Sequence, residues 1–241
     1  QVICYLIYLE ILLINSCGQC KINSFSIYSV NLSVTNKCHF YFMKNSIQNQ
    51  LGQTDIYLID QILKGRYTPA DIILDAGCGN GRNMHWFLHN GYHITGIDIS
   101  EVAIAQLKSN YPGLPEDKAA VCALNHMPFA DNHFDHIICS AVLHFANSVA
   151  DFNCMFTEMI RVLKPGGSLF LRMTTDIGIE NKVELIADGV YAIPDGSTRF
   201  LLTRHLLADC VHQHNLSFME PLKTVNVDDV RCMCTLLLQK H

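Results

Sequence analysis

The sequence predicts an α/β fold whose central sheet is mainly parallel and covered by helices on both faces. Two observations predict it. Apolar strand-like segments alternate with segments of helical spacing from about residue 55 to residue 173, and such alternation is typical of right-handed β-α-β units. An apolar run, Ile72 to Leu74, also leads directly into a turn with glycines at positions 77, 79 and 81, as in a buried strand that ends near a ligand.

Each element has its own local signal. Residues 55–65 have apolar side chains at helical spacing, and Gly65 is placed as a helix C-cap. Ser100 is a favourable N-cap for the helix after the second strand. We expect strands at residues 71–76, 92–98, 119–123, 134–140 and 167–173, and helices at residues 55–65, 82–90, from Ser100 onward, and at 149–162.

The last third of the chain departs from strict alternation. Pro194-Asp-Gly196 is a turn signal between two apolar segments, so we expect a hairpin near residues 190–202, which we interpret as a lid over a substrate site. A helix from Thr203 to about Gln213 follows, and then strands near residues 217–224 and 231–239. We expect these two consecutive strands to pair antiparallel.

The most informative segment is the turn Asp71-Ile-Ile-Leu-Asp-Ala-Gly-Cys-Gly-Asn-Gly-Arg82. An acid, Asp75, precedes its first glycine, and the second strand ends in another acid, Asp98. Nucleoside-binding α/β folds place an acid about 20 residues after the glycines, where it accepts hydrogen bonds from ribose hydroxyls. The rhythm G-x-G-x-G differs from the dinucleotide fingerprint, which would need glycine where Arg82 stands.

Four further segments have a common order and spacing. They are Met127-Pro-Phe with Asn132-His-Phe-Asp135, Ser140-Ala-Val-Leu-His-Phe145, Glu158-Met-Ile-Arg-Val-Leu-Lys-Pro-Gly-Gly167, and Asp55-Ile-Tyr-Leu58 taken with residues 77–83. Together with the glycine-rich turn, they resemble the class I S-adenosylmethionine-dependent methyltransferases from about residue 50 onward. The pattern is similar to an uncharacterised bacterial subgroup near the methyltransferase type 11 and tellurite-resistance branches.

The resemblance implies a Rossmann-like, doubly wound, mainly parallel seven-stranded sheet with an antiparallel last strand. It also implies S-adenosylmethionine as methyl donor. In that family pattern, Gly77 and Gly79 let the backbone approach the methionine portion, Asp75 holds its ammonium group, and Arg82 pairs with its carboxylate. The alternatives are a helix cap at the strand end for Asp75 and a solvated surface charge for Arg82.

The resemblance places the nucleoside near the second and third strands. Asp98 is expected to hold the ribose hydroxyls, and Ile99 to pack on the adenine. Many family members carry an Asp where this chain has Ala123; the backbone amide of Leu124 and the side chain of Asn125 are expected to take over that contact. The predicted donor-binding set also includes Cys78 and Ser140.

The methyl acceptor is less clearly indicated. The Asn-Pro-Pro-Tyr segment of amide and exocyclic-amine methylators is replaced by Ser140-Ala-Val-Leu, and no Pro-Cys nucleophile is present. His144 is the first candidate for a general base, with a packed histidine as the alternative; Tyr57 and Glu180 are the next candidates. The remaining histidines, including His212 and His214, lack ligand spacing, so no metal is implied.

Composition narrows the class of partner. A net charge of −5 and a pI near 6.2 argue against nucleic acid as a partner, and no apolar run reaches the roughly 18 to 20 residues that span a bilayer. The 11 cysteines favour reduced thiols in a cytoplasmic protein. We therefore expect a small-molecule acceptor, with an RNA-modifying methyltransferase and a noncatalytic nucleoside-binding scaffold as the alternatives.

The first 42 residues differ from the rest in composition. They contain few charges and an apolar run from Val2 to Ile14. A truncated export signal and a metal or redox pair at Cys17 and Cys20 are alternatives. We expect residues 1–42 to be extraneous or disordered, and residues 43–241, from Met43, to form the methyltransferase domain.

Overall fold

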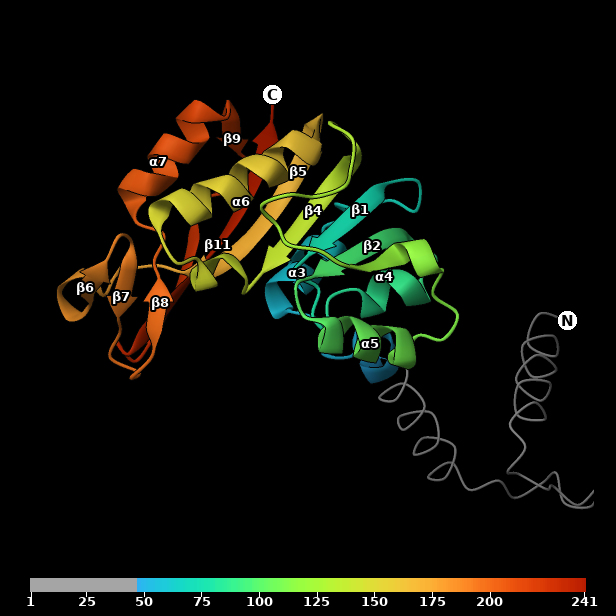
Figure 1. Ribbon diagram of the computed structural model, residues 1–241, viewed down its shortest axis with the longest axis horizontal. Coiled ribbons are helices and arrows are strands. Elements are labelled where there is room, and N and C mark those ends of the chain that lie inside the picture. Colours follow the sequence, from blue (N-terminus) through green and yellow to red (C-terminus); the bar gives the residue numbers. More distant parts are fainter. Residues whose placement is uncertain (1–46) are drawn as a thin grey trace, which may run out of the picture. The chain divides into compact units, whose positions relative to one another are not determined.

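A mainly parallel sheet forms the centre of the computed structural model, which describes residues 47–241 (Figure 1). Its strands are ordered β10-β11-β5-β4-β1-β2-β3, and β9 pairs with β11 beside this path. Strands β3, β2, β1, β4 and β5 are parallel, whereas β11 is antiparallel to β5 and β10. The predicted fold class is therefore confirmed, although the sheet has eight strands and not the seven expected, because β9 also pairs with β11. The predictions for residues 1–42, Met43, Cys17 and Cys20 lie outside the described residues.

The strands of this sheet agree well with the apolar segments of the sequence. Residues 134–140 form a strand as predicted, and the predicted strand 119–123 is shorter. The strands are β1 (Ile72–Ala76), β2 (His93–Asp98), β3 (Ala119–Val121), β4 (Phe134–Ser140), β5 (Leu163–Thr174), β9 (Leu216–Phe218), β10 (Lys223–Val227) and β11 (Arg231–Lys240).

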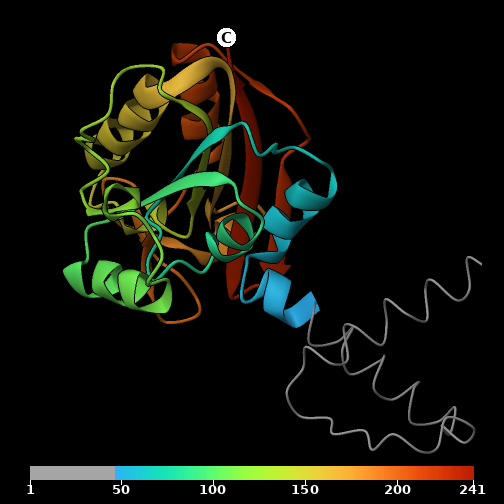
Figure 2. The same ribbon diagram turned by 90° about the vertical axis from the view of Figure 1, so that its right-hand side faces the viewer.

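Helices cover both faces of the sheet, and Figure 2 shows α3 and α6 on opposite sides of it. One apolar cluster contains side chains of α6 and α7, and the other contains side chains of α3, α4 and α5. The helices are α3 (Ile56–Leu63), α4 (His85–His89), α5 (Glu101–Asn110), α6 (Val149–Val162) and α7 (Arg204–Gln213). Within residues 47–241, no helix has the length and apolarity needed to cross a membrane.

Neighbouring residues of the central strands belong to opposite clusters. Ile73 packs in the cluster of α3 to α5, and Leu74 in the cluster of α6 and α7. Ile138 and Ile137 are divided in the same way on β4, and all four side chains are at most 1% exposed. Because successive side chains of a strand point to opposite faces, a strand buried on both faces is apolar throughout. This explains the uninterrupted apolar runs of the sequence.

The helix predicted for residues 82–90 is wrong in its first part. Only His85–His89 form α4, and residues 80–84 are turns. The side chain of Asn83 accepts a hydrogen bond from the backbone N–H of Asp55, at 3.0 Å. This contact ties the turn to the start of α3. A helix of five residues also supplies little dipole at the turn.

The C-terminal third differs from the prediction in two places. The strand predicted near residues 217–224 is two short strands, β9 and β10, which pair with different parts of β11. The expected hairpin is formed by β7 (Val190–Ala192) and β8 (Thr198–Phe200), and β6 (Glu184–Ala187) adds a third strand that the sequence did not indicate. These three strands form a separate small antiparallel sheet.

Arg161 fixes the loop that leads into β4. Its guanidinium donates to both carboxylate oxygens of Glu158, at 2.7 Å each, and to Asp131 at 2.6 Å. It also donates to the carbonyl oxygens of Met127 and Phe129. A planar guanidinium has enough donors for all of these acceptors. The Glu158 and Arg161 motif therefore has a structural role.

Replacing Arg161 with Gln is expected to lower the free energy of unfolding by about 2 kcal/mol, because Glu158 and two carbonyl groups lose their donor. The matched control is Arg204→Gln, which changes an exposed arginine on α7 and should shift stability by less than about 0.5 kcal/mol. Urea unfolding curves measure both. Equal shifts for the two variants would contradict the structural role of Arg161.

Candidate functional site

The glycine-rich turn is tied to the end of β2 by backbone hydrogen bonds. The N–H groups of Gly77 and Cys78 both donate to the carbonyl oxygen of Ile97, at 2.8 and 2.9 Å. The N–H of Gly79 donates to the Asp98 carboxylate, with a nitrogen–oxygen distance of 2.8 Å. The structure therefore brings together the turn and the acid that the sequence predicted to share a site.

Two of the glycines are required for different reasons. Gly77 has a φ of +81°, and a Cβ there would collide with the side chain of Val142. Gly79 has a φ of +56°, but a Cβ there would meet nothing within 4 Å. Gly77 is therefore needed for close packing of the turn against the segment after β4. Gly79 instead leaves bare backbone facing open space, where a ligand can approach.

The Asp98 carboxylate is held in a defined orientation at the tip of β2. One oxygen accepts from the N–H of Gly79, and the other accepts from the N–H of Ser100 at 2.9 Å. A carboxylate has about four lone-pair sites, so the described contacts leave room for two further donors. That number suits the two hydroxyl groups of a ribose.

Asp75 is buried without a hydrogen-bond partner. The residue is 1% exposed, and neither carboxylate oxygen has a partner within residues 47–241. Burial raises the pKa of Asp75 to about 7; Arg82 lowers the pKa and Asp98 raises it. The carboxylate accepts no backbone N–H, so the helix-cap alternative is wrong. A buried carboxylate without donors is a position for a ligand that brings its own N–H groups.

Arg82 stands at the entrance of this site. Its side chain is 40% exposed, and Nη2 lies 3.9 Å from an oxygen of Asp55. This distance is too long for a hydrogen bond, so the guanidinium retains donors for another anion. The structure therefore gives Arg82 a neighbour that the sequence did not indicate.

Asp55 is the main residue that sequence reasoning missed. It is the N-cap of α3, where it accepts from the N–H of Tyr57. Its other oxygen accepts from the Ser140 hydroxyl at 3.3 Å and from Nη1 of Arg172 at 3.0 Å. The capping role can be read from the sequence because Asp is a common N-cap. Its partners 85 and 117 residues away leave no local signal.

The remaining predicted donor-binding residues lie around the turn. Burial raises the pKa of the Cys78 thiol, whose Sγ donates to the carbonyl of Gly79. Ile99 is 74% exposed next to Asp98, as a platform for a ring would be. Leu124 is buried, and Asn125 beside it is exposed. The Ser140 hydroxyl donates its hydrogen bond to Asp55, so its proton is already used within the protein.

The three candidate bases are in different environments. His144 lies in the short turn η2 (Leu143–Phe145), 8% exposed, with no partner for Nδ1 among the described residues. Burial and, to a lesser degree, nearby arginines lower the pKa of His144 to about 4. The Tyr57 ring lies under the Arg172 guanidinium, 5.0 Å from its centroid. Glu180 is exposed after β5, and hydrogen bonds to backbone groups lower its pKa.

No group of three His, Cys, Asp or Glu side chains suited to a metal ion is found in residues 47–241. The seven cysteines of this part are free, and five are buried.

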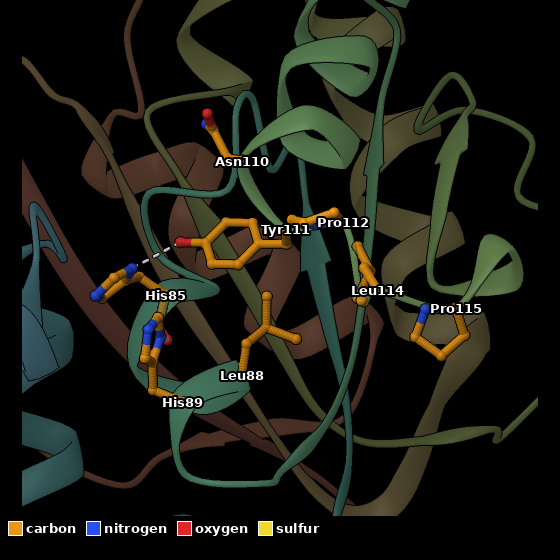
Figure 3. Close-up of a pocket in the computed structure, with 9 residues that line it drawn as sticks. His85, Leu88, His89, Asn110, Tyr111, Pro112, Leu114 and Pro115 are labelled. Atoms are coloured by element: carbon orange, nitrogen blue, oxygen red, sulfur yellow. Dashed lines mark hydrogen bonds between the residues drawn. The ribbon is translucent and has the colours of Figure 1, made fainter. Parts of the chain in front are cut away.

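A larger pocket, of about 760 Å³, lies elsewhere, between α4 and the segment after α5 (Figure 3). The carbonyl of Asn49 accepts from Nε2 of His85, so Nδ1 of His85 accepts from the Tyr111 hydroxyl, at 2.7 Å. Leu88 and Leu114 are among the apolar residues that line it. None of the predicted donor-binding residues lines this pocket. Cavity size alone would therefore point away from the glycine-rich turn.

The sequence and the fold are similar to those of known proteins. Residues 74–171 match the family described as "Methyltransferase domain". Together with the relatives and the fold described next, this match supports a class I S-adenosylmethionine-dependent methyltransferase domain. It is 28% identical over 189 residues to the ubiquinone/menaquinone biosynthesis C-methyltransferase UbiE of Desulfotalea psychrophila, covering 70% of this chain and 74% of that protein.

Two further comparisons agree with this family. The chain is 31% identical over 121 residues to the uncharacterized methyltransferase YodH of Bacillus subtilis, covering 48% of this chain and 46% of that protein. The match thus spans about half of the length of YodH. The fold is that of a S-adenosylmethionine-dependent methyltransferase from Methanosarcina mazei, with a TM-score of 0.62 at 22% identity, over 74% of this chain and 96% of that one.

Replacing Asp75 with Asn tests whether burial without a partner raises the pKa of this acid. The pKa of Asp75 is about 7 when folded against an ordinary value of 3.8, so between these values the folded protein binds more protons than the unfolded chain. Stability therefore falls through ionisation of Asp75 as pH rises from about 4 to 7. Asp75→Asn removes this effect and should gain about 1 kcal/mol or more relative to wild type between pH 5 and pH 8.

The measurement is urea unfolding of the wild-type protein and Asp75→Asn at both pH values, without added donor. All other titrating groups cancel in the difference between the two proteins. A difference in unfolding free energy that is the same at pH 5 and pH 8 would show that Asp75 is already ionised in the fold.

Proposed function

We propose that the protein transfers a methyl group from S-adenosylmethionine to a small-molecule acceptor by in-line displacement. The observation that carries the proposal is the combination of a bare backbone at Gly79, a buried carboxylate without donors at Asp75, and the oriented carboxylate of Asp98. These three features lie on β1, β2 and the turn between β1 and α4. They fit the methionine and ribose portions of the donor.

Each of these residues has a defined task in donor binding. Asp98 accepts hydrogen bonds from the two ribose hydroxyls, and Asp75 accepts them from the ammonium group, which favours its ionised form. Arg82 pairs with the methionine carboxylate. Ile99 packs on the adenine, while the Leu124 amide and Asn125 face its edge. The donor supplies an electrophilic methyl group on a sulfonium, so the protein mainly positions the two partners.

Positioning is a large effect by itself. Holding two reactants in alignment contributes about 7–11 kcal/mol to lowering the barrier. A base with a pKa near 4, such as His144 in this state, removes a proton poorly at neutral pH. The environment of His144 therefore favours an acceptor that is already ionised, or one whose binding raises the pKa of His144. Tyr57 and Glu180 stay secondary candidates.

The small sheet of β6, β7 and β8 is proposed as the lid. It is joined to the main fold through Leu202, which follows β8 and whose N–H and carbonyl bond with Thr174 and Thr175 at the end of β5. Residues of β7 and β8 line a pocket of about 300 Å³ together with His144. A lid at this place would exclude water from the acceptor.

A small molecule is the acceptor class that the observations favour. The relative UbiE is named for ubiquinone and menaquinone biosynthesis, and a net charge of −5 disfavours an RNA surface. A noncatalytic scaffold would not need the open backbone at Gly79. We place the protein in the cytoplasm, where its donor is available.

Replacing Gly79 with Ala tests the donor site directly. The added methyl group would occupy the space through which the donor approaches, so calorimetry should show at least about tenfold weaker S-adenosylmethionine binding. Gly91→Ala is the matched control, because Gly91 also has a positive φ, of +72°, and open space at its Cβ position. Each variant should lose about 1–2 kcal/mol of stability. Equal donor affinity in the two variants would refute the placement.

Methyl transfer is tested by formation of S-adenosylhomocysteine from the donor. We expect turnover with a small-molecule metabolite extract and none with total RNA. Asp98→Ala should abolish turnover with the extract at a donor concentration that saturates the wild-type protein, since the ribose loses its anchor. Donor binding without product from any extract fraction would support the scaffold alternative, and product from RNA alone would contradict the small-molecule acceptor.

A further inference from the structure

The pocket beside His144 has walls from two parts of the fold. One wall is η2 with the residues that follow it, and the other is the small sheet of β6 to β8. The pocket measures about 300 Å³, the size of a site for a single-ring molecule. The residues that matter for its chemistry are His144, Phe145, Val190, Thr198, Arg199 and Phe200.

The pocket contains a guanidinium but no acid. No Asp or Glu lines it, and Arg199 is its charged residue. The Arg199 guanidinium lies over the Phe145 ring, 5.2 Å from the ring centroid, and Nη1 donates to the carbonyl of Thr198 at 2.7 Å. Within residues 47–241, no carboxylate lies within 4.0 Å of Arg199. The side chain is thus oriented by Phe145 and Thr198, and it forms no direct ion pair with a described residue.

Two more arginines add to the positive potential around His144. Arg172 and Arg231, like Arg199, are close enough to lower the pKa of His144, although burial has the largest effect. Arg172 has an ion-pair partner in Asp55 at 3.0 Å, and Arg231 has one in Asp195 at 3.8 Å. Arg199 is the one of these three that lines the pocket.

The apolar part of the pocket suits a flat ring. Phe145 is 63% exposed, although large apolar side chains usually bury most of their surface, and Val190 of the small sheet also lines the pocket. An aromatic ring bound here would cover Phe145, and an oxyanion on that ring would meet Arg199. Arginine pairs with carboxylate and phosphate through two parallel hydrogen bonds.

We propose that the methyl acceptor is an aromatic molecule that carries an oxyanion, either a carboxylate or a phosphate monoester, and that Arg199 binds this anion while the ring lies against Phe145. The proposal rests on the proposed methyltransferase function, because it names the substrate class of the same site. Arg199 is then a specificity-determining residue, distinct from the residues that hold the donor.

The test compares three probes of similar shape: benzoate, phenyl phosphate and neutral benzamide. Each is titrated into the full chain with S-adenosylhomocysteine present, and binding is followed by ligand-observed NMR. At least one of the two anions should bind about fivefold or more tightly than benzamide. The better anion identifies whether a carboxylate or a phosphate is the preferred group.

Two variants separate the pocket from the rest of the surface. Arg199→Gln should reduce the preference for the anion over benzamide to less than about twofold, while Arg204→Gln, an exposed arginine on α7, should keep it. Donor affinity, measured by calorimetry on the same samples, should be unchanged in both variants. Unchanged donor affinity would also show that both variants are folded.

Two results would overturn the proposal. In one, benzamide binds the wild-type protein as tightly as both anions do. In the other, Arg199→Gln keeps the full preference. If the wild-type protein does not bind the donor, the proposed methyltransferase function is contradicted instead. The probe titrations would still show whether the pocket prefers an anion. The two failures are therefore distinguishable.

Discussion

The hydrogen bond from the Gly79 N–H to the Asp98 carboxylate is the interaction on which the donor site depends. It joins the turn after β1 to the tip of β2, and it orients the acid through one of its two oxygens. The second oxygen is held by the N–H of Ser100, which also caps α5. A single residue thus connects the turn, the sheet edge and the next helix. Asp75 is buried with no partner of its own among the described residues, which is why we propose that it receives the ammonium group of the donor.

Local sequence patterns were sufficient to predict the elements around the proposed donor site. β4 and α6 have the predicted bounds because an apolar run and the N-cap Ser148 mark them clearly. The predicted turn and acid lie together because parallel strands place their carboxyl ends at one edge of the sheet. The start of α4 was predicted three residues too early, and the contact of the Asn83 side chain with Asp55, 28 residues away, has no local signal in the sequence. The third strand β6 has exposed side chains throughout, so its sequence has no alternation to read.

The region around the proposed acceptor pocket depends on contacts between segments that are distant in the sequence. Asp55, Ser140 and Arg172 meet although they are far apart in the chain, and Arg199 reaches Phe145 only because the small sheet folds back over η2. The charges of the two proposed sites are opposite: Asp75 and Asp98 lie at the proposed donor site, whereas Arg199 lines the proposed acceptor pocket. A net charge of −5 hides this separation. Arg199, together with Arg172 and Arg231, also lowers the pKa of His144. The charge that would bind the acceptor therefore also weakens His144 as a base for removing a proton from that acceptor.

The most direct measurement of the central claim is a crystal structure of the protein with S-adenosylhomocysteine bound. The account predicts the ribose hydroxyls on the Asp98 carboxylate, the ammonium group within hydrogen-bond distance of Asp75, and the ligand passing over Gly79. A ligand bound in the larger pocket beside His85 and Tyr111, with the turn left empty, would contradict it.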